Sequence, residues 1–438
     1  MRMLQQRPKR ALVLGGGGAR GAYEIGVWQA LRELGMEFDI VTGTSVGALN
    51  GAMVAQDDFD AAKAIWREIS IGDVLDLDMP EIDIHNRQDM MGLVATMAKK
   101  AVNEGGTGIN NLHKTLEKYI DEERVRASSL EFAFVTVEYP SLHPHSLRPK
   151  DIPLGKLIDY LMASAACFPA FKAWEIDGKT FIDGGYYDNI PINLALEMGA
   201  EDVIAVDLRA VGLHPKLHKT HAKIRYIRPW RSLGNLVTFD RAFSERNMVW
   251  GYQDALKVLS DLEGEKFTFL PGEPDKMAQK HAPAFAATLR LLTKSGHASL
   301  DKVAESRLFG LLKEKRAYGE TYGDLLLICA ECAGEIFQVP ELQTYRFDVF
   351  DQVLLQNYEE WLERWQRLAP HFKPSLASFS EISHRLAILD KKALTAFLVW
   401  SLEQTEAKRI SIADMQARAL AFRREMAAAA YLYTIKQN

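Results

Sequence analysis

A serine at position 45 stands in a sequence context that suits a nucleophile. Ser45 lies between Gly43 and Gly47 in a G-x-S-x-G pattern, which follows a short apolar, β-branched run and precedes small residues compatible with a helix. This strand–turn–helix context predicts a nucleophile elbow, in which a sharp turn holds the serine clear of the sheet. The positive end of the following helix would then face a developing oxyanion. The alternative interpretation is an ordinary tight turn between a strand and a helix.

A glycine-rich segment precedes the elbow. It joins an apolar strand at 11–14 to a helix that ends at Gly35. One interpretation is a dinucleotide site, because the glycines match G-x-G-x-x-G, but that site needs an acid at the end of the second strand and Asp39 lies at its start. A phosphate-binding P-loop is disfavoured because no Lys-Ser or Lys-Thr pair follows. The remaining interpretation is an oxyanion hole, since consecutive glycines expose backbone N–H groups beside the elbow.

An aspartate at position 183 provides a candidate base. A turn at Asp177-Gly178 and a strand at 180–182 lead into Asp183, and two glycines let the chain turn beside that carboxylate. A Ser-Asp-His triad would need a histidine further downstream. The histidines available there are His214, His218 and His221. They lie in a polar stretch typical of an exposed loop, and the elbow follows only the second strand, so a triad of the α/β-hydrolase type is disfavoured.

These three motifs, in this order, resemble the patatin-like phospholipase family in its bacterial type. The resemblance covers roughly residues 10–265 and extends to Phe168-Pro169, to the segment 188–191 and to the strand at 203–206. It implies a Ser–Asp dyad without histidine, in which Ser45 is the nucleophile and Asp183 the general base. It also assigns an oxyanion hole to the amides of the glycine loop and to Arg20. The residues implied for that hole are Gly16, Gly17, Gly18 and Arg20, and the glycines that support the motifs are Gly21, Gly43, Gly47, Gly184 and Gly185.

The dyad is chemically reasonable only if the site alters the aspartate. An ordinary carboxylate, with a pKa near ~4, is a poor base for a serine hydroxyl. Burial in a narrow apolar site raises that pKa, and an oxyanion hole lowers the barrier that the base must help to cross. The two-step chemistry through an acyl-enzyme needs neither a metal nor an organic cofactor.

Composition limits the classes of partner. The chain has 438 residues and a net charge of −5, so it offers no electrostatic footprint for nucleic acid. Three cysteines do not form a disulfide framework and favour a reducing compartment. The basic N-terminus lacks the pattern of a secretory signal, and no apolar run reaches the ~18 residues of a membrane span. We therefore expect a cytoplasmic protein, and a peripheral contact with membranes stays open.

The pattern of elements predicts two domains. Residues 1–265 alternate strands and helices, which predicts a parallel sheet with helices on its faces. The resemblance implies that this is a patatin-like three-layer α/β/α domain with a mainly parallel central sheet. Residues 266–438 show no strong strand signal and are expected to form an all-α domain. Its predicted helices are 282–295, 298–316, 318–337, 341–368, 378–388, 390–406 and 411–435.

Several residues outside the motifs receive structural interpretations. Ser164 is expected to serve close helix packing, and the C-x-x-C formed by Cys329 and Cys332 is expected on a buried helix face and not at a metal. Arg418 and its neighbours are expected on a solvated helix face, with interfacial binding as the alternative. The segment 72–111 reads as irregular and methionine-rich, for which helix packing is favoured over an adaptable lid. Its methionines are Met79, Met90, Met91 and Met97.

Together these features predict a serine lipid acyl hydrolase of the phospholipase A or lysophospholipase type, acting on a lipid or fatty-acyl ester. Two alternatives stay open. The same residues would serve a general carboxylesterase or thioesterase. A regulatory protein whose helical domain binds a lipid or a protein partner would use the first domain only as a module.

Overall fold

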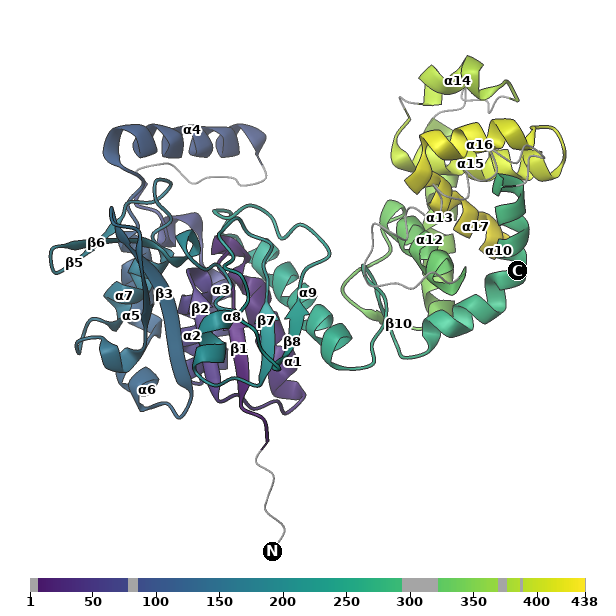
Figure 1. The fold of residues 1–438 in the computed structure, drawn as a ribbon. Helices are drawn as coiled ribbons and strands as arrows, with labels where there is room; N and C mark the ends of the chain where they lie inside the picture. Colours follow the sequence, from purple (N-terminus) through teal and green to yellow (C-terminus); the bar gives the residue numbers. More distant parts are fainter. Residues whose placement is uncertain (1–6, 78–85, 294–321, 369–375, 387–388, 438) are drawn as a thin grey trace, which may run out of the picture. The chain divides into compact units, whose positions relative to one another are not determined.

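The computed structural model describes residues 7–77, 86–293, 322–368, 376–386 and 389–437. The chain divides into two compact units, Met1–Ser260 and Asp261–Asn438. Each unit has its own apolar core. Figure 1 shows that the first unit combines strands and helices, whereas the second is mostly helical.

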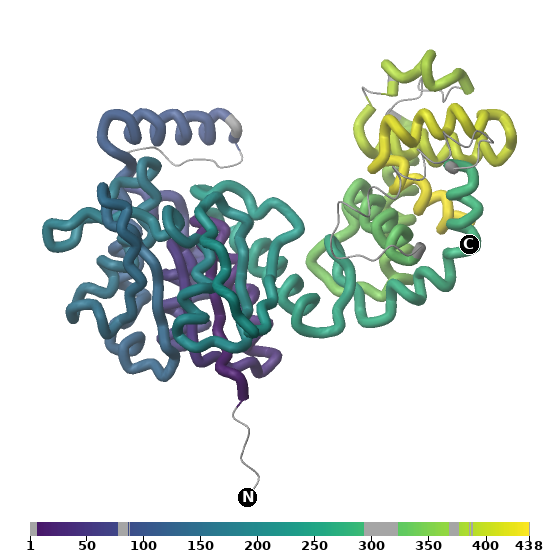
Figure 2. The backbone as a smooth tube through the Cα atoms, in the orientation of Figure 1, coloured from purple at the N-terminus to yellow at the C-terminus, as the bar shows by residue number. Residues whose placement is uncertain are grey.

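The first unit is built on a mixed, eight-stranded sheet. The strand order is β5-β6-β3-β2-β1-β7-β8, and β4 pairs with β3 beside this path. The neighbouring strands β3, β2, β1, β7 and β8 pair in parallel. Strands β4 and β6 pair with β3, and β5 pairs with β6, in antiparallel fashion. Figure 2 shows how the first strand lies beside strands from much later in the chain. The strands are β1 (Arg10–Leu14), β2 (Ile40–Thr44), β3 (Glu131–Tyr139), β4 (His143–Leu147), β5 (Trp174–Ile176), β6 (Lys179–Asp183), β7 (Asp202–Val206) and β8 (Lys223–Ile227).

Helices cover both faces of this sheet because its central strands are apolar on both sides. In β1, Leu12 and Leu14 belong to one core cluster, whereas Ala11 and Val13 belong to another on the opposite face. The larger cluster includes side chains from α1, α2, α3, α5, α7 and α9, and the smaller one is closed by α8. The predicted α/β/α arrangement with a mainly parallel sheet is therefore confirmed. The helices are α1 (Ala22–Glu33), α2 (Val46–Ala55), α3 (Phe59–Glu68), α4 (Arg87–Glu104), α5 (Asn110–Tyr119), α6 (Glu122–Ala127), α7 (Leu157–Ala165), α8 (Ile192–Glu197) and α9 (Arg241–Leu259).

The segment predicted as irregular contains a long helix. Helix α4 has 18 residues and begins where the Asn86 side chain accepts a hydrogen bond from the Gln88 N–H. Met97 packs into the core, and Met91 is exposed. Met79 lies outside the described residues.

The second unit is mainly helical. It differs from an all-α domain by a small parallel pair of strands, β9 (Thr268–Phe269) and β10 (Thr344–Tyr345). The predicted helix at 298–316 lies outside the described residues. The helices described in the second unit are α10 (Glu273–Thr293), α12 (Tyr322–Ile336), α13 (Phe347–Leu368), α14 (Phe379–Leu386), α15 (Lys391–Glu406), α16 (Ile412–Ala421) and α17 (Arg423–Lys436). None of the helices that the structure describes is long and apolar enough to cross a membrane.

Two expectations for the second unit are corrected. The helix predicted at 411–435 is broken at Phe422 into α16 and α17. Arg418 does not lie on a solvated face: it is fully buried, donates to the Ser401 hydroxyl over 2.8 Å and pairs with Asp414 over 2.7 Å. A buried guanidinium is tolerated because its N–H groups are hydrogen-bonded. Cys329 and Cys332 are buried on α12, as expected.

Candidate active site

Ser45 lies at the sharp turn between β2 and α2. Its φ of 54° and ψ of −127° place a non-glycine residue in a strained backbone conformation. The Ser45 N–H donates to the hydroxyl of Ser164 over 2.9 Å, and that hydroxyl donates to the Val135 carbonyl over 2.7 Å. Ser164 therefore fixes the elbow to the neighbouring strand, a positioning role that its place in a small-residue helix did not indicate.

The glycines of the motifs lie where backbone segments approach closely. A Cβ at Gly47 would lie closer than 3.0 Å to the carbonyl oxygen of Leu14, and one at Gly43 would meet the carbonyl of Gly47 in the same way. The elbow can therefore lie tightly against β1 only without these side chains. A Cβ at Gly184 would likewise meet the carbonyl oxygen of Val135, whereas one at Gly21 would meet the Val46 and Trp66 side chains and one at Gly185 the Asn189 side chain.

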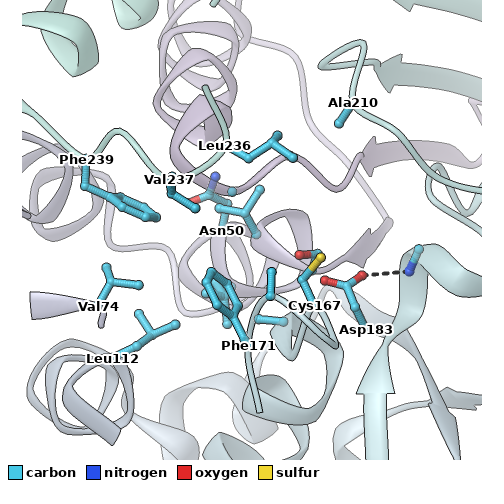
Figure 3. Close-up of a pocket in the computed structure, with 18 of the residues that line it drawn as sticks. Asn50, Val74, Leu112, Cys167, Phe171, Asp183, Ala210, Leu236, Val237 and Phe239 are labelled. Carbon is cyan, nitrogen blue, oxygen red and sulfur yellow. Dashed lines mark hydrogen bonds between the residues drawn. The ribbon is translucent and has the colours of Figure 1, made fainter. Parts of the chain in front are cut away.

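Asp183 is brought to the elbow by strand pairing. In the sheet, Asp183 pairs with Thr136 on β3, while Thr44 pairs with the adjacent Val135. Thr44, which precedes Ser45, and Asp183 therefore lie on opposite sides of β3 at nearly the same level of the sheet. The Asp183 Oδ1 accepts a hydrogen bond from the Gly185 N–H over 2.7 Å (Figure 3). Burial raises the pKa of Asp183 to about 6, against the opposing effects of the Ser45 hydroxyl and the Gly185 N–H.

The glycine loop supplies two candidate oxyanion donors. The N–H of Gly16 is engaged, because it donates to the Asn189 carbonyl over 2.9 Å. Gly17 and Gly18 line the cavity beside Ser45, and within the described part of the chain their N–H groups have no hydrogen-bond acceptor. The amides of these two residues are thus available, and that of Gly16 is not.

Arg20 does not occupy the expected place. Its guanidinium donates to the carbonyls of Gly234 over 2.9 Å and of Arg209 over 2.8 Å. Arg20 is absent from the described residues that line the cavity. Its side chain instead joins two loops that contribute Ala210 and Leu236 to the cavity wall.

A mainly apolar cavity of about 500 Å³ opens beside the Ser45 and Asp183 side chains. Figure 3 shows Asp183 and Cys167 at one side of this cavity, and Val74, Leu112 and Phe239 at the other. Its apolar wall includes Leu49, Met53, Ile65, Trp66, Ile69, Val74, Leu112, Leu116, Phe171, Leu236, Val237 and Phe239. Met90, Met91 and Met97 do not line it, so they do not form the lid considered above.

A buried carboxyl group lies behind this wall. Glu24 is 1% exposed and accepts a hydrogen bond from the Asn50 side-chain amide over 2.8 Å. The Asn50 oxygen accepts in turn from the Trp66 indole over 3.0 Å, and both Asn50 and Trp66 line the cavity. Burial raises the pKa of Glu24 to about 8. Sequence reasoning missed this residue, although an acid within the apolar helix 22–34 was a signal for it.

Neither the histidines nor the cavity cysteine is placed or ionised as an alternative to Ser45 or Asp183. His214, His218 and His221 are exposed in the loop between β7 and β8, as expected, and none of them lines the cavity within the described residues. Burial and the neighbouring Asp183 raise the pKa of Cys167 to about 12, so its thiol is neutral and weakly nucleophilic.

Fold and site together define a three-layer α/β/α domain that presents a serine on an elbow beside a buried carboxylate. Residues 12–196 match the family model described as patatin-like phospholipase, so the chain carries a domain of that family. Rat patatin-like phospholipase domain-containing protein 7 is 29% identical over 207 residues, which are 45% of this chain and 13% of that protein.

Two further proteins are similar to this chain. Lysophospholipase nte1 of Aspergillus terreus is 29% identical over 200 residues, covering 46% of this chain and 12% of that protein. The chain thus spans about an eighth of the length of these curated relatives. The solved structure of VipD from Legionella pneumophila aligns over 96% of this chain and 91% of its own, with a TM-score of 0.36 and 14% identity.

Proposed function

We propose that the protein is a serine lipid acyl hydrolase that works through a Ser45–Asp183 dyad. The observation that carries the proposal is the joint position of these two side chains at the side of an apolar cavity of about 500 Å³. A cavity of this size and lining suits an acyl chain, and the serine lies where the ester carbonyl of such a chain would be attacked.

The first step forms an acyl-enzyme. Asp183 accepts the proton of the Ser45 hydroxyl as the Oγ atom attacks the ester carbon. The oxyanion then accepts hydrogen bonds from the N–H groups of Gly17 and Gly18, near the positive end of α2. When the intermediate collapses, the C–O bond to the alcohol breaks and Asp183 returns its proton to the departing oxygen.

The second step consumes one water. Asp183 takes a proton from the water, whose oxygen attacks the acyl carbon, and the proton returns to the Ser45 Oγ as the fatty acid leaves. A carboxylate with a pKa of about 6 is charged at neutral pH and is a stronger base than an ordinary aspartate. The burial that raises this pKa therefore supports both steps.

The substrate class follows from the cavity and from the names of the relatives. The apolar wall has no charged side chain beyond Asp183 among the described residues that form it. Similar proteins are named phospholipase and lysophospholipase. We therefore propose phospholipid or lysophospholipid esters as substrates.

The proposal is tested with Ser45→Ala and Asp183→Asn. We expect each to lower kcat by at least about a thousandfold, because each removes a group that acts on the reacting atoms. Hydrolysis of a lysophospholipid and a simple medium-chain ester, together with labelling by a fluorophosphonate probe, would measure this. Preference for the simple ester would indicate a general carboxylesterase.

Two controls make the result specific. Asp177→Asn changes an exposed aspartate on the same hairpin and should leave activity near that of the parent. His214→Ala, His218→Ala and His221→Ala should each have little effect. A folded histidine variant without activity, or a folded Asp183→Asn variant with substantial turnover, would contradict the dyad.

A further inference from the structure

The loop between β7 and β8 combines exposed cations with exposed apolar side chains. The segment 209–223 contains no acidic residue. Its cations are Arg209, Lys216, Lys219 and Lys223, all of them exposed. Val211 is 95% exposed, Leu213 60% and Leu217 41%. Side chains of both kinds in one exposed segment are typical of surfaces that bind anionic lipid interfaces.

This loop also forms part of the cavity wall. Val211 and Leu213 line the cavity, and Figure 3 shows Ala210 away from Val74 and Leu112, which close the other side. The Leu213 N–H donates to the Gly185 carbonyl over 2.8 Å, two residues after Asp183. A surface that meets the apolar side chains of the loop would therefore lie beside the opening that leads to the dyad.

The loop is held in place at several points, so its exposed side chains form a defined surface. The Asn189 N–H donates to the Leu213 carbonyl over 2.8 Å, and the Asn193 side-chain amide donates to the Lys216 carbonyl over 3.0 Å. Within the described part of the chain, Lys216, Lys219 and Lys223 form no ion pair with a carboxylate. Their charges are thus available to an anionic partner.

We infer that the 209–223 loop docks the protein on an anionic lipid surface, with the cavity opening toward the acyl chains. The inference rests on the proposed function for the identity of the partner. The cations attract the lipid headgroups and the apolar side chains enter the interface, which brings a lipid ester to the opening without extracting it through water. A nucleic acid would contact the cations but would leave the exposed valine and leucines without an apolar partner.

The test measures binding in the absence of turnover. The 438-residue chain carrying Ser45→Ala is sedimented with phosphatidylcholine vesicles that contain or lack phosphatidylglycerol. We expect partitioning onto the anionic vesicles, weakened by added salt. The combined Lys216→Ala, Lys219→Ala and Lys223→Ala substitutions should lower it by roughly tenfold or more, since each basic residue near an anionic surface contributes to binding.

A matched triple variant distinguishes an effect of this loop on binding from an effect of the protein's net charge. Lys114→Ala, Lys118→Ala and Lys150→Ala remove the same charge from exposed positions elsewhere in the first unit and should leave partitioning unchanged. Equal loss in both triple variants, or no binding of the parent to anionic vesicles, would overturn the inference, and the second outcome would favour an acidic protein surface as the partner. Because the assay uses the Ser45→Ala protein, its outcome does not depend on hydrolysis.

Discussion

At the scale of single residues, the proposed role of Asp183 as general base predicts how activity depends on pH. Burial raises its pKa to about 6, and the proposed dyad needs its charged form. We therefore expect kcat/KM to be constant above this pKa and to fall about tenfold per pH unit below it. A pH profile with a soluble ester measures this. A profile that stays flat down to about pH 4, the range of an ordinary aspartate, would contradict the assignment.

Glu24 makes a separate prediction about stability. Its pKa rises from an ordinary value of 4.5 to about 8 in the folded state. Between these values the folded protein holds a proton that the unfolded chain has lost, so the free energy of unfolding falls as pH rises. Glu24→Gln removes this dependence and keeps an acceptor for the Asn50 amide. As the pH rises from 5 to 8, we expect the free energy of unfolding of the variant to increase relative to that of the parent by on the order of a few kcal/mol.

Urea unfolding of both proteins at the two pH values would measure the Glu24 effect. The control is Glu37→Gln, because the Glu37 side chain is 83% exposed and its replacement should leave the pH dependence as it is in the parent. If the free energy of unfolding of Glu24→Gln depended on pH as it does in the parent, Glu24 would be charged in the folded protein.

At the scale of elements, helix α5 closes the side of the cavity away from the dyad. Leu112 projects from it into the cavity wall (Figure 3). Leu112→Trp would shorten the space for an acyl chain. Since each buried methylene contributes about 0.8 kcal/mol, excluding two of them would lower kcat/KM for long-chain esters roughly tenfold. Short-chain esters should react as before.

A series of esters of increasing chain length would show this shift. Leu154→Trp adds the same ring at a position that is 84% exposed, and it should not change the chain-length preference. Equal loss on short and long esters in Leu112→Trp would mean that the helix does not limit the acyl chain.

Local signals account for the elements that the sequence predicted. Apolar, β-branched runs and glycines mark β1, β2 and the elbow, because these features act within a few residues. Strand β4 was missed since its segment His143–Leu147 is polar and half-exposed, and its hydrogen bonds depend on β3. The Gly16 N–H is not available to an oxyanion because it donates to the carbonyl of Asn189, 173 residues away, and no local pattern could show this. The burial of Arg418 depends in the same way on Ser401 in α15 and on the carbonyl of Ala377, just before α14.

At the scale of the whole molecule, each unit contains a buried tyrosine–aspartate pair. In the first unit the Tyr23 hydroxyl donates to Asp254 over 2.8 Å. In the second, the Tyr431 hydroxyl donates to Asp351, which also bonds His281 over 2.7 Å. In both pairs burial and the neighbouring carboxylate raise the pKa of the tyrosine well above its ordinary value, so the hydroxyl remains a donor. Removing the tyrosine hydroxyl from either pair is therefore the same chemical substitution, made in one core or in the other.

We expect the units to unfold in two transitions, each sensitive to its own pair. Tyr23→Phe and Tyr431→Phe each leave a buried carboxylate oxygen without its donor, at a cost of about 2 kcal/mol. For units of this size that corresponds to roughly 4–8 °C in Tm. Differential scanning calorimetry should show Tyr23→Phe lowering one transition and Tyr431→Phe the other, with fluorophosphonate labelling of Ser45 lost at the Tyr23-sensitive transition. A single transition lowered equally by both variants would instead show that the two cores unfold as one cooperative structure.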